Sequence, residues 1–321
     1  MKSPTSALLL LLAVAIPALA AEPRVTTYFP VPQGARPHDV AATSQAGGPV
    51  YYTAQATGRL GILDPANGKV VEIPLGERSA PHGVVVGPDG APWITDGGQN
   101  AIVRVDPSTH AVRRFALPES APSANLNTLT FDRSGRAWFT GQSGYYGRVD
   151  PASGDVRVWR APRGSGPYGI TTTPSGDVYY ASLAGSHIAR IDVATGEATI
   201  IEPPTRNQGA RRVWSDSKGN VWVSYWNTGQ VGRYDPVKRA WSEWKLPGNA
   251  RAYSVWVDPD DHVWLTDWTT NAIVEFDPAT AKFTSYPSDR DAANVRQMLG
   301  RAGEAWGAES GTDRLVRIVT R

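Results

Sequence analysis

The sequence predicts an all-β protein, a seven-bladed β-propeller of four-stranded blades whose ring is closed by the N-terminal strand. Aromatic anchors recur at separations of 42, 45, 41, 43, 42 and 42 residues, which indicates seven copies of one repeat. A series of aspartates keeps the same period, and the last repeat lacks a strand. The anchors are Tyr51, Trp93, Trp138, Tyr179, Trp222, Trp264 and Trp306, and the aspartates are Asp64, Asp106, Asp150, Asp192, Asp235 and Asp277.

Each repeat reads as four short strands. In the second repeat, apolar β-forming segments cover 83–86, 92–95, 101–105 and 111–117, and Asp89-Gly90 supplies a hairpin turn between the first two. Helix signals are absent. Four strands in a repeat of this length are typical of a propeller blade, a fold that protects its strand edges by closing a ring.

The two ends of the chain complement each other. The seventh repeat stops after its third strand, at residues 314–319, whereas residues 24–31 precede the first repeat and resemble the fourth strand of the others. We therefore expect the N-terminal strand to complete the last blade, which makes residues 21–321 a single domain.

Residues 1–20 read as a signal peptide. Lys2 gives the charged start, residues 8–16 are apolar and Ala18-Leu19-Ala20 forms a cleavage site, which predicts a periplasmic or secreted protein without a membrane span. The chain has no cysteine, which excludes thiol catalysis and disulfides. Its 32 Lys and Arg against 30 Asp and Glu, with no dense basic run, argue against nucleic acid as a partner. We expect a monomer.

Two series of residues should converge on one face of the disc. The first and second strands of a blade are antiparallel, so the start of the first strand and the end of the second lie together. Trp226 and Trp268 lie just beyond the strand ends. Together with the two series, they would frame a site for a small-molecule or cyclic peptide ligand with apolar and polar parts. The strand-start series is His38, His82, Asn127, Tyr168, Arg211 and Tyr253, and the strand-end series includes Asp96, Ser182, Tyr225, Asp267 and Glu309.

Each candidate also has a structural interpretation. A histidine after proline, as at His38 and His82, can cap a turn, although its repetition in adjacent blades favours function. Asp96, Asp267 and Glu309 can hold the loop that follows their strand by accepting hydrogen bonds from backbone amides. Either interpretation is compatible with the sequence.

The second repeat resembles the blade consensus of the virginiamycin B lyase (streptogramin lyase) family. The resemblance lies in PHGVVVGPDGAPWITD at 81–96 and NAIVRV at 100–105, with weaker copies at 167–170, 264–267 and 271–273. Because the resemblance is one of repeats, it covers essentially the whole mature chain. It implies a seven-bladed propeller.

The resemblance also implies an activity. Members of this family linearise type B streptogramins, which are cyclic depsipeptide antibiotics, by magnesium-dependent elimination across the ester C–O bond. Carried onto this chain, it implies His82 as general base, His38 as a substrate-positioning residue and Asp96 as a ligand of Mg²⁺. Asp267 and Glu309 are further metal candidates because they end the second strand of their blades, as Asp96 does. Tyr168, Arg211, Tyr253, Trp226 and Trp268 would bind substrate.

The chain departs from the family pattern at several positions. Ala80 stands where the family has a second metal-binding carboxylate, and Asp96 stands where it has glutamate. The histidine pair falls in the first two repeats, whereas the family carries it in the last two, where this chain has Tyr253, Arg296 and Glu309.

Two other functions stay open at this point. A non-catalytic propeller could bind a periplasmic ligand or protein on the same face, because a fold does not fix a function. A metal-dependent lactonase of the gluconolactonase type would need a cage of carboxylates and asparagine, to which Asn127, Asp267 and Glu309 could contribute. Metal dependence and product analysis separate the three.

Overall fold

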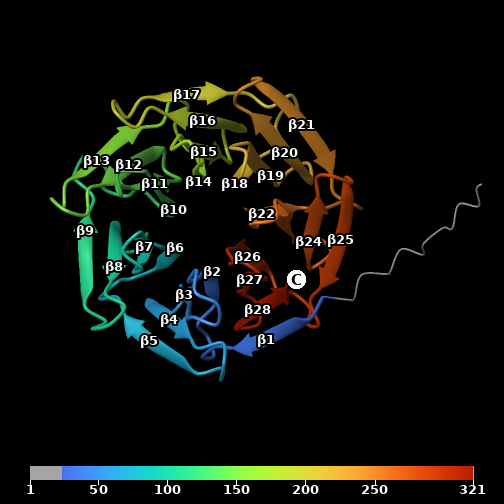
Figure 1. Cartoon of the computed structure of the whole chain (residues 1–321). Coiled ribbons are helices and arrows are strands. Elements are labelled where there is room, and N and C mark those ends of the chain that lie inside the picture. Colours follow the sequence, from blue (N-terminus) through green and yellow to red (C-terminus); the bar gives the residue numbers. More distant parts are fainter. Residues whose placement is uncertain (1–23, 321) are drawn as a thin grey trace, which may run out of the picture.

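The computed structural model describes residues 24–320, which form seven antiparallel four-stranded sheets arranged in a ring (Figure 1). The predicted fold is confirmed. The predicted signal peptide, residues 1–20, lies outside the described residues. No helix among residues 24–320 is long and apolar enough to cross a membrane.

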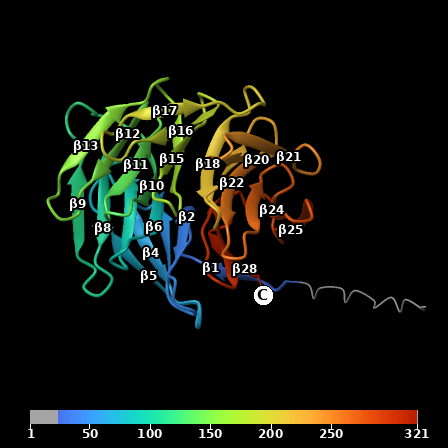
Figure 2. The same cartoon turned by 45° about the horizontal axis from the view of Figure 1, so that its top comes forward.

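Each blade is a four-stranded meander whose first strand lies nearest the axis of the ring (Figure 1). Figure 2 shows the same ring tilted, with the strands running across the thickness of the disc. The first four blades are β2 (Pro37–Ala42), β3 (Val50–Ala54), β4 (Arg59–Leu63) and β5 (Val70–Pro74); β6 (Pro81–Val86), β7 (Pro92–Asp96), β8 (Ala101–Val105) and β9 (Val112–Ala116); β10 (Leu126–Phe131), β11 (Ala137–Gly141), β12 (Tyr145–Val149) and β13 (Val156–Arg160); β14 (Pro167–Thr172), β15 (Val178–Ser182), β16 (His187–Ile191) and β17 (Ala198–Ile201).

The remaining blades include the one that closes the ring. They are β18 (Ala210–Ser215), β19 (Val221–Tyr225), β20 (Gln230–Asp235) and β21 (Ala240–Lys245); β22 (Ala252–Val257), β23 (Val263–Asp267), β24 (Ala272–Asp277) and β25 (Lys282–Pro287); and β26 (Val295–Met298), β27 (Glu304–Glu309), β28 (Arg314–Val319) and β1 (Thr26–Pro30).

The N-terminal strand closes the ring as predicted. Strand β1 pairs antiparallel with β28, in a register that places Thr26 opposite Ile318 and Pro30 opposite Arg314. This pairing gives the last blade its fourth, outer strand and provides hydrogen-bond partners for the backbone of β28, which would otherwise expose a row of donors and acceptors.

The aromatic anchors lie in the core between blades. Trp138 and Trp264 are fully buried, and Trp93 is 1% exposed. The indole Nε1 atoms of Trp138 and Trp264 donate to Asp132 Oδ2 and Asp258 Oδ2, at 2.8 and 2.9 Å. These two tryptophans therefore join the hydrophobic packing to the turn before their own strand.

Candidate active site

Every inner strand carries an irregularity at the same place. The pairing of β2 with β3 shifts register between Pro37 and Val40, and the other six blades shift at the equivalent position. A β-bulge of this kind re-aims side chains. As a result, consecutive residues such as His38 and Asp39 both contribute to the polar cluster at the centre of the ring.

Hydroxyl groups on the second strands hold the bulges in place. Thr53 Oγ1 accepts a hydrogen bond from the Asp39 amide at 3.0 Å and donates to the His82 carbonyl of the next blade at 2.7 Å. Thr95 Oγ1 repeats this pattern, accepting from the Gly83 amide at 2.8 Å and donating to the Asn127 carbonyl at 2.6 Å. Each hydroxyl therefore fixes the inner strand of its own blade against that of the next.

Glycine at two inner-strand positions lets neighbouring strands come close. A Cβ atom at Gly83 would lie 2.5 Å from the carbonyl oxygen of Asn127, and one at Gly169 would lie 2.7 Å from Cα of Arg212. Side chains larger than hydrogen would push the inner strands apart, so these glycines help to bring the central residues into contact.

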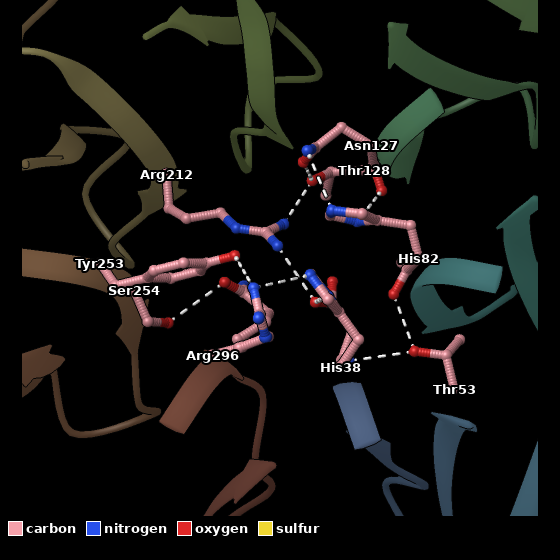
Figure 3. Close-up of polar contacts among 12 residues, drawn as sticks. His38, Thr53, His82, Asn127, Thr128, Arg212, Tyr253, Ser254 and Arg296 are labelled. Atoms are coloured by element: carbon pink, nitrogen blue, oxygen red, sulfur yellow. Dashed lines mark hydrogen bonds and ion pairs between the residues drawn. The ribbon is translucent and has the colours of Figure 1, made fainter. Parts of the chain in front are cut away.

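The two predicted histidines meet at the centre (Figure 3). The ring centroids of His38 and His82 are 3.8 Å apart, and the residues are 2% and 8% exposed. His82 Nδ1 donates to the backbone carbonyl oxygen of Asn127 at 3.0 Å, and His82 Nε2 accepts from the side-chain amide of Asn127 at 3.3 Å. His38 Nδ1 donates to Asp39 Oδ1 at 2.8 Å, and His38 Nε2 lies 3.3 Å from Arg296 Nη1.

This environment keeps both imidazoles neutral. Burial lowers the pKa of His38 well below 6.5, and the guanidinium groups of Arg296 and Arg212 lower it further. Burial and the neighbouring His38 likewise lower the pKa of His82, against the opposing effect of Asp39. Each ring therefore presents Nε2 as an acceptor, because Nδ1 carries the proton.

A buried ion pair crosses the centre of the ring. Asp39 Oδ1, on β2, accepts from Arg212 Nη2, on β18, at 3.0 Å, and both side chains are 1% exposed. Arg212 Nη1 also donates to Thr128 Oγ1, and the guanidinium lies over the Tyr168 ring, 5.1 Å from its centroid. Arg212 thus connects blades one, three and five (Figure 3).

Tyr253 is surrounded by cations. Its hydroxyl lies 3.0 Å from that of Tyr168, and the Arg211 guanidinium carbon lies 3.7 Å from the centre of its ring. Burial by itself raises the pKa of the Tyr253 phenol, but Arg211, Arg212 and Arg296 outweigh burial and lower this pKa to about 8. Tyr253 can therefore donate a proton at neutral pH more readily than an ordinary tyrosine.

Two partly exposed tryptophans border this cluster, as the sequence predicted. Trp268 stacks on Tyr253, with centroids 4.9 Å apart and planes at 11°, and Trp226 meets Trp268 edge to face at 5.6 Å. The structure thus brings together seven of the ten predicted site residues. They are His38, His82, Tyr168, Arg211, Tyr253, Trp226 and Trp268.

The three predicted metal carboxylates hold loops of their own blades. Asp96 Oδ1 accepts from the amides of Ala80 and Gln99, and Oδ2 accepts from Ser79 Oγ and Gln99 Nε2. Asp267 accepts from the Arg251 and Thr269 amides.

Glu309 follows the same pattern, accepting from Ser288, Thr312 and Arg314. Among residues 24–320, one cluster of three His, Asp or Glu side chains has ligand atoms within 4.8 Å of one another, and it is His38, Asp39 and His82. Asp96, Asp267 and Glu309 are therefore not brought together.

The sequence pattern predicts no role for Asp39, Arg212 or Arg296, and the structure places all three in the site. Regular strand alternation places Asp39 and Arg212 on the face opposite His38 and Arg211, and only the bulge turns both toward the centre. The sequence does carry a signal. A hydroxyl residue stands two positions after the anchor in five blades, and it marks each of these bulges: Thr53, Thr95, Thr140, Ser224 and Thr266.

Solved structures share this fold across nearly the whole chain. Virginiamycin B lyase from Staphylococcus aureus superposes with a TM-score of 0.84 at 20% identity, covering 93% of this chain and 100% of that one. A catalytically inactive histidine-to-alanine variant of that lyase with quinupristin superposes equally well, with the same identity and coverage. At this identity the likeness shows the fold.

Sequence comparisons identify the family. A gluconolactonase of Zymomonas mobilis subsp. mobilis is 33% identical over 101 residues, which is 30% of this chain and 27% of the relative's own length. The profile of the virginiamycin B lyase family matches residues 12–252, about three quarters of the chain. The chain therefore belongs to the virginiamycin B lyase family.

Proposed function

We propose that this protein is a carbon–oxygen lyase, which removes a proton from a carbon next to a carbonyl group and breaks a C–O bond at the adjacent carbon. Type B streptogramins and related cyclic esters are the substrates that the family suggests. The observation that carries the proposal is the contact between a neutral histidine pair and a cluster of cationic groups at the centre of the ring. Elimination requires a base of this kind beside a group that stabilises an enolate.

His82 is the proposed base. Because its Nδ1 proton is held by the Asn127 carbonyl, the lone pair lies on Nε2, and among residues 24–320 the side-chain amide of Asn127 is its one hydrogen-bond partner, at 3.3 Å. Burial keeps the ring neutral by lowering its pKa, so it can accept a proton throughout the neutral range. His38, fixed by Asp39, is a positioning residue for its neighbour.

Arginine provides the positive charge at this site. Arg296 Nη1 lies 3.3 Å from His38 Nε2 and 3.5 Å from the Tyr253 hydroxyl, beside the proposed base. A guanidinium group donates hydrogen bonds to an enolate or to a departing carboxylate and stays charged at all relevant pH values. The Tyr253 phenol is a suitable proton donor for a leaving oxygen.

The residues at the centre do not fit magnesium. Mg²⁺ prefers carboxylate and other oxygen ligands in octahedral geometry, whereas the central cluster offers two imidazoles and the single carboxylate of Asp39. That carboxylate is already paired with Arg212, and Arg296 adds a further cation. The proposed reaction therefore contains no metal step.

The test is incubation with a type B streptogramin, followed by mass spectrometry of the product. We expect a linear product that has gained no water molecule and contains a new alkene. His82→Asn should lower the rate at least a hundredfold, the usual scale for loss of a general base. His110→Asn changes an exposed histidine of an outer turn and is the matched control.

Other products would identify the alternatives. A hydrolysed acid in place of an alkene would indicate the lactonase, to which the partial gluconolactonase match points. Binding without turnover would indicate a non-catalytic propeller. If His82→Asn retains full activity, His82 is not the base.

A further inference from the structure

Blades five to seven present three arginines without a carboxylate partner. Among residues 24–320, no ion pair joins Arg211, Arg251 or Arg296 to an acidic side chain, although fourteen ion-pair contacts join other arginines and a lysine to acidic side chains. The one carboxylate of the central cluster, Asp39, is paired with Arg212. This side of the site therefore carries an excess of positive charge.

Aromatic rings hold these arginines in place. The Arg211 guanidinium carbon lies 4.6 Å from the ring centres of both Tyr168 and Trp226, and Arg211 Nη2 donates to the Tyr168 hydroxyl at 2.7 Å. Arg251 lies 5.3 Å from the centre of the Trp226 ring, and Arg296 lies 5.2 Å from that of Trp268. Their positions are thus set without an anion from the protein.

Two buried donors in this region lack a partner. The Nε atoms of Arg211 and Arg212 make no hydrogen bond, and Arg212 is only 1% exposed. Unsatisfied buried donors are costly, and a bound acceptor is a common explanation for them. Arg211 and Arg296 are partly exposed, and Arg251 is exposed.

The adjoining tryptophans form a surface for a flat or ring-shaped group. Trp226 and Trp268 are partly exposed and meet edge to face, with their planes at 80° and a centroid distance of 5.6 Å. Trp268 Nε1 donates to the Val295 carbonyl at 2.8 Å, which fixes the orientation of that ring. Rigid indole faces beside guanidinium groups suit a ligand that joins a ring to an anion.

We infer that the site also accepts an acidic saccharide containing 4-linked uronate units, whose carboxylate is bound by Arg211, Arg251 and Arg296 and whose ring lies against Trp226 and Trp268. This inference rests on the proposed lyase function, because it specifies a further substrate class for the same site. A 4-linked uronate unit has an acidic C–H next to its carboxylate and a glycosidic C–O bond on the adjacent carbon, as β-elimination requires.

The reaction balances without a further reactant. His82 Nε2 takes the proton next to the carboxylate, and the electron pair of that C–H bond forms the C=C bond. The glycosidic C–O bond then breaks, and the leaving oxygen takes a proton from the Tyr253 phenol. Neutralisation of the carboxylate by guanidinium groups makes the C–H bond more acidic.

Binding is tested by titrating the full protein with oligosaccharides of galacturonate and of mannuronate while tryptophan fluorescence is recorded. The matched ligands are their methyl esters, which keep the ring and remove the charge. The acids should bind at least tenfold more tightly than the esters, and Arg211→Gln and Arg251→Gln should each weaken acid binding about tenfold. Arg160→Gln is the matched control, because Arg160 also lies over an aromatic ring, that of Tyr145, on an outer strand.

Turnover is measured separately, from the ultraviolet absorbance of the unsaturated product. Binding of the acids without absorbance supports the anionic ligand and contradicts the lyase. Equal cleavage of acid and ester supports the lyase and overturns this inference. It is also overturned if neither acid binds, or if Arg160→Gln weakens binding as much as Arg211→Gln does.

Discussion

The two sides of the central ring use the same strand position for opposite chemistry. In blades one to three, His38, His82 and Asn127 are uncharged and hydrogen-bonded to their neighbours. In blades five to seven, the equivalent positions carry Arg211, Tyr253 and Arg296, which form a cationic and aromatic cluster. A repeated backbone thus supplies a proton acceptor on one side and an anion-binding surface on the other.

One carboxylate is hydrogen-bonded to both sides of the ring. Asp39 accepts from His38 on its own side and from Arg212 across the ring. Without it, Arg212 would be a buried cation with no counter-ion, and His38 would lose the acceptor that fixes its tautomer. Loss of Asp39 should therefore disturb both sides of the ring.

Removal of Asp39 should have the largest effect. Asp39→Ala should lower the free energy of unfolding by about 3–5 kcal/mol, because a buried charge is left unpaired. Chemical denaturation measures this, and the double variant Asp39→Ala with Arg212→Met should recover part of the loss. Asp155→Ala, which breaks the exposed pair with Arg157, should cost at most about 1 kcal/mol. If Asp39→Ala and Asp155→Ala lower the free energy of unfolding equally, the central pair contributes no more to stability than an exposed pair, and this prediction is wrong.

Lowering the pH should lower the free energy of unfolding, because His38 and His82 are buried as neutral rings. The folded-state pKa values of His38 and His82 lie below 6.5, so the unfolded chain binds protons first as the pH falls. Stability from these groups is present above about pH 6.5 and decreases below it, by at most about 1.4 kcal/mol per pH unit for each histidine. Denaturation curves between pH 7 and 5 measure the slope. His82→Asn should have a shallower slope than wild type and than His110→Asn, and an unchanged slope would contradict a neutral buried His82.

A smaller loss than that of Asp39→Ala should follow substitution of the predicted metal residue Asp96. Asp96→Asn should cost about 1–2 kcal/mol of stability, because it weakens charge-assisted hydrogen bonds to the Ala80 and Gln99 amides. Turnover should change little, and a chelator should affect neither wild type nor variant. If chelation stops the wild-type reaction and Asp96→Asn mimics it, magnesium acts here despite the residues at the centre.

The repeat itself made most of the fold predictable. Anchors such as Trp93 and Trp264 recur with turn residues at fixed offsets, and each blade is a local meander, so seven blades follow from one pattern. Closure by residues 24–31 followed from the incomplete last repeat. The meeting of His38 and His82 was predictable for the same reason, since equivalent positions of adjacent blades are neighbours in a ring.

The sequence by itself thus determined the blades, the closure and one series of central residues, because these depend on local periodicity. Tertiary structure decided the rest. The bulge brings Asp39 to the centre, where it meets Arg212, 173 positions away, and no local pattern encodes that pair. The hydrogen bonds of Asp96 were also decided in three dimensions, because a carboxylate at a strand end binds whichever donors the neighbouring loop brings, and here these are Ser79, Ala80 and Gln99.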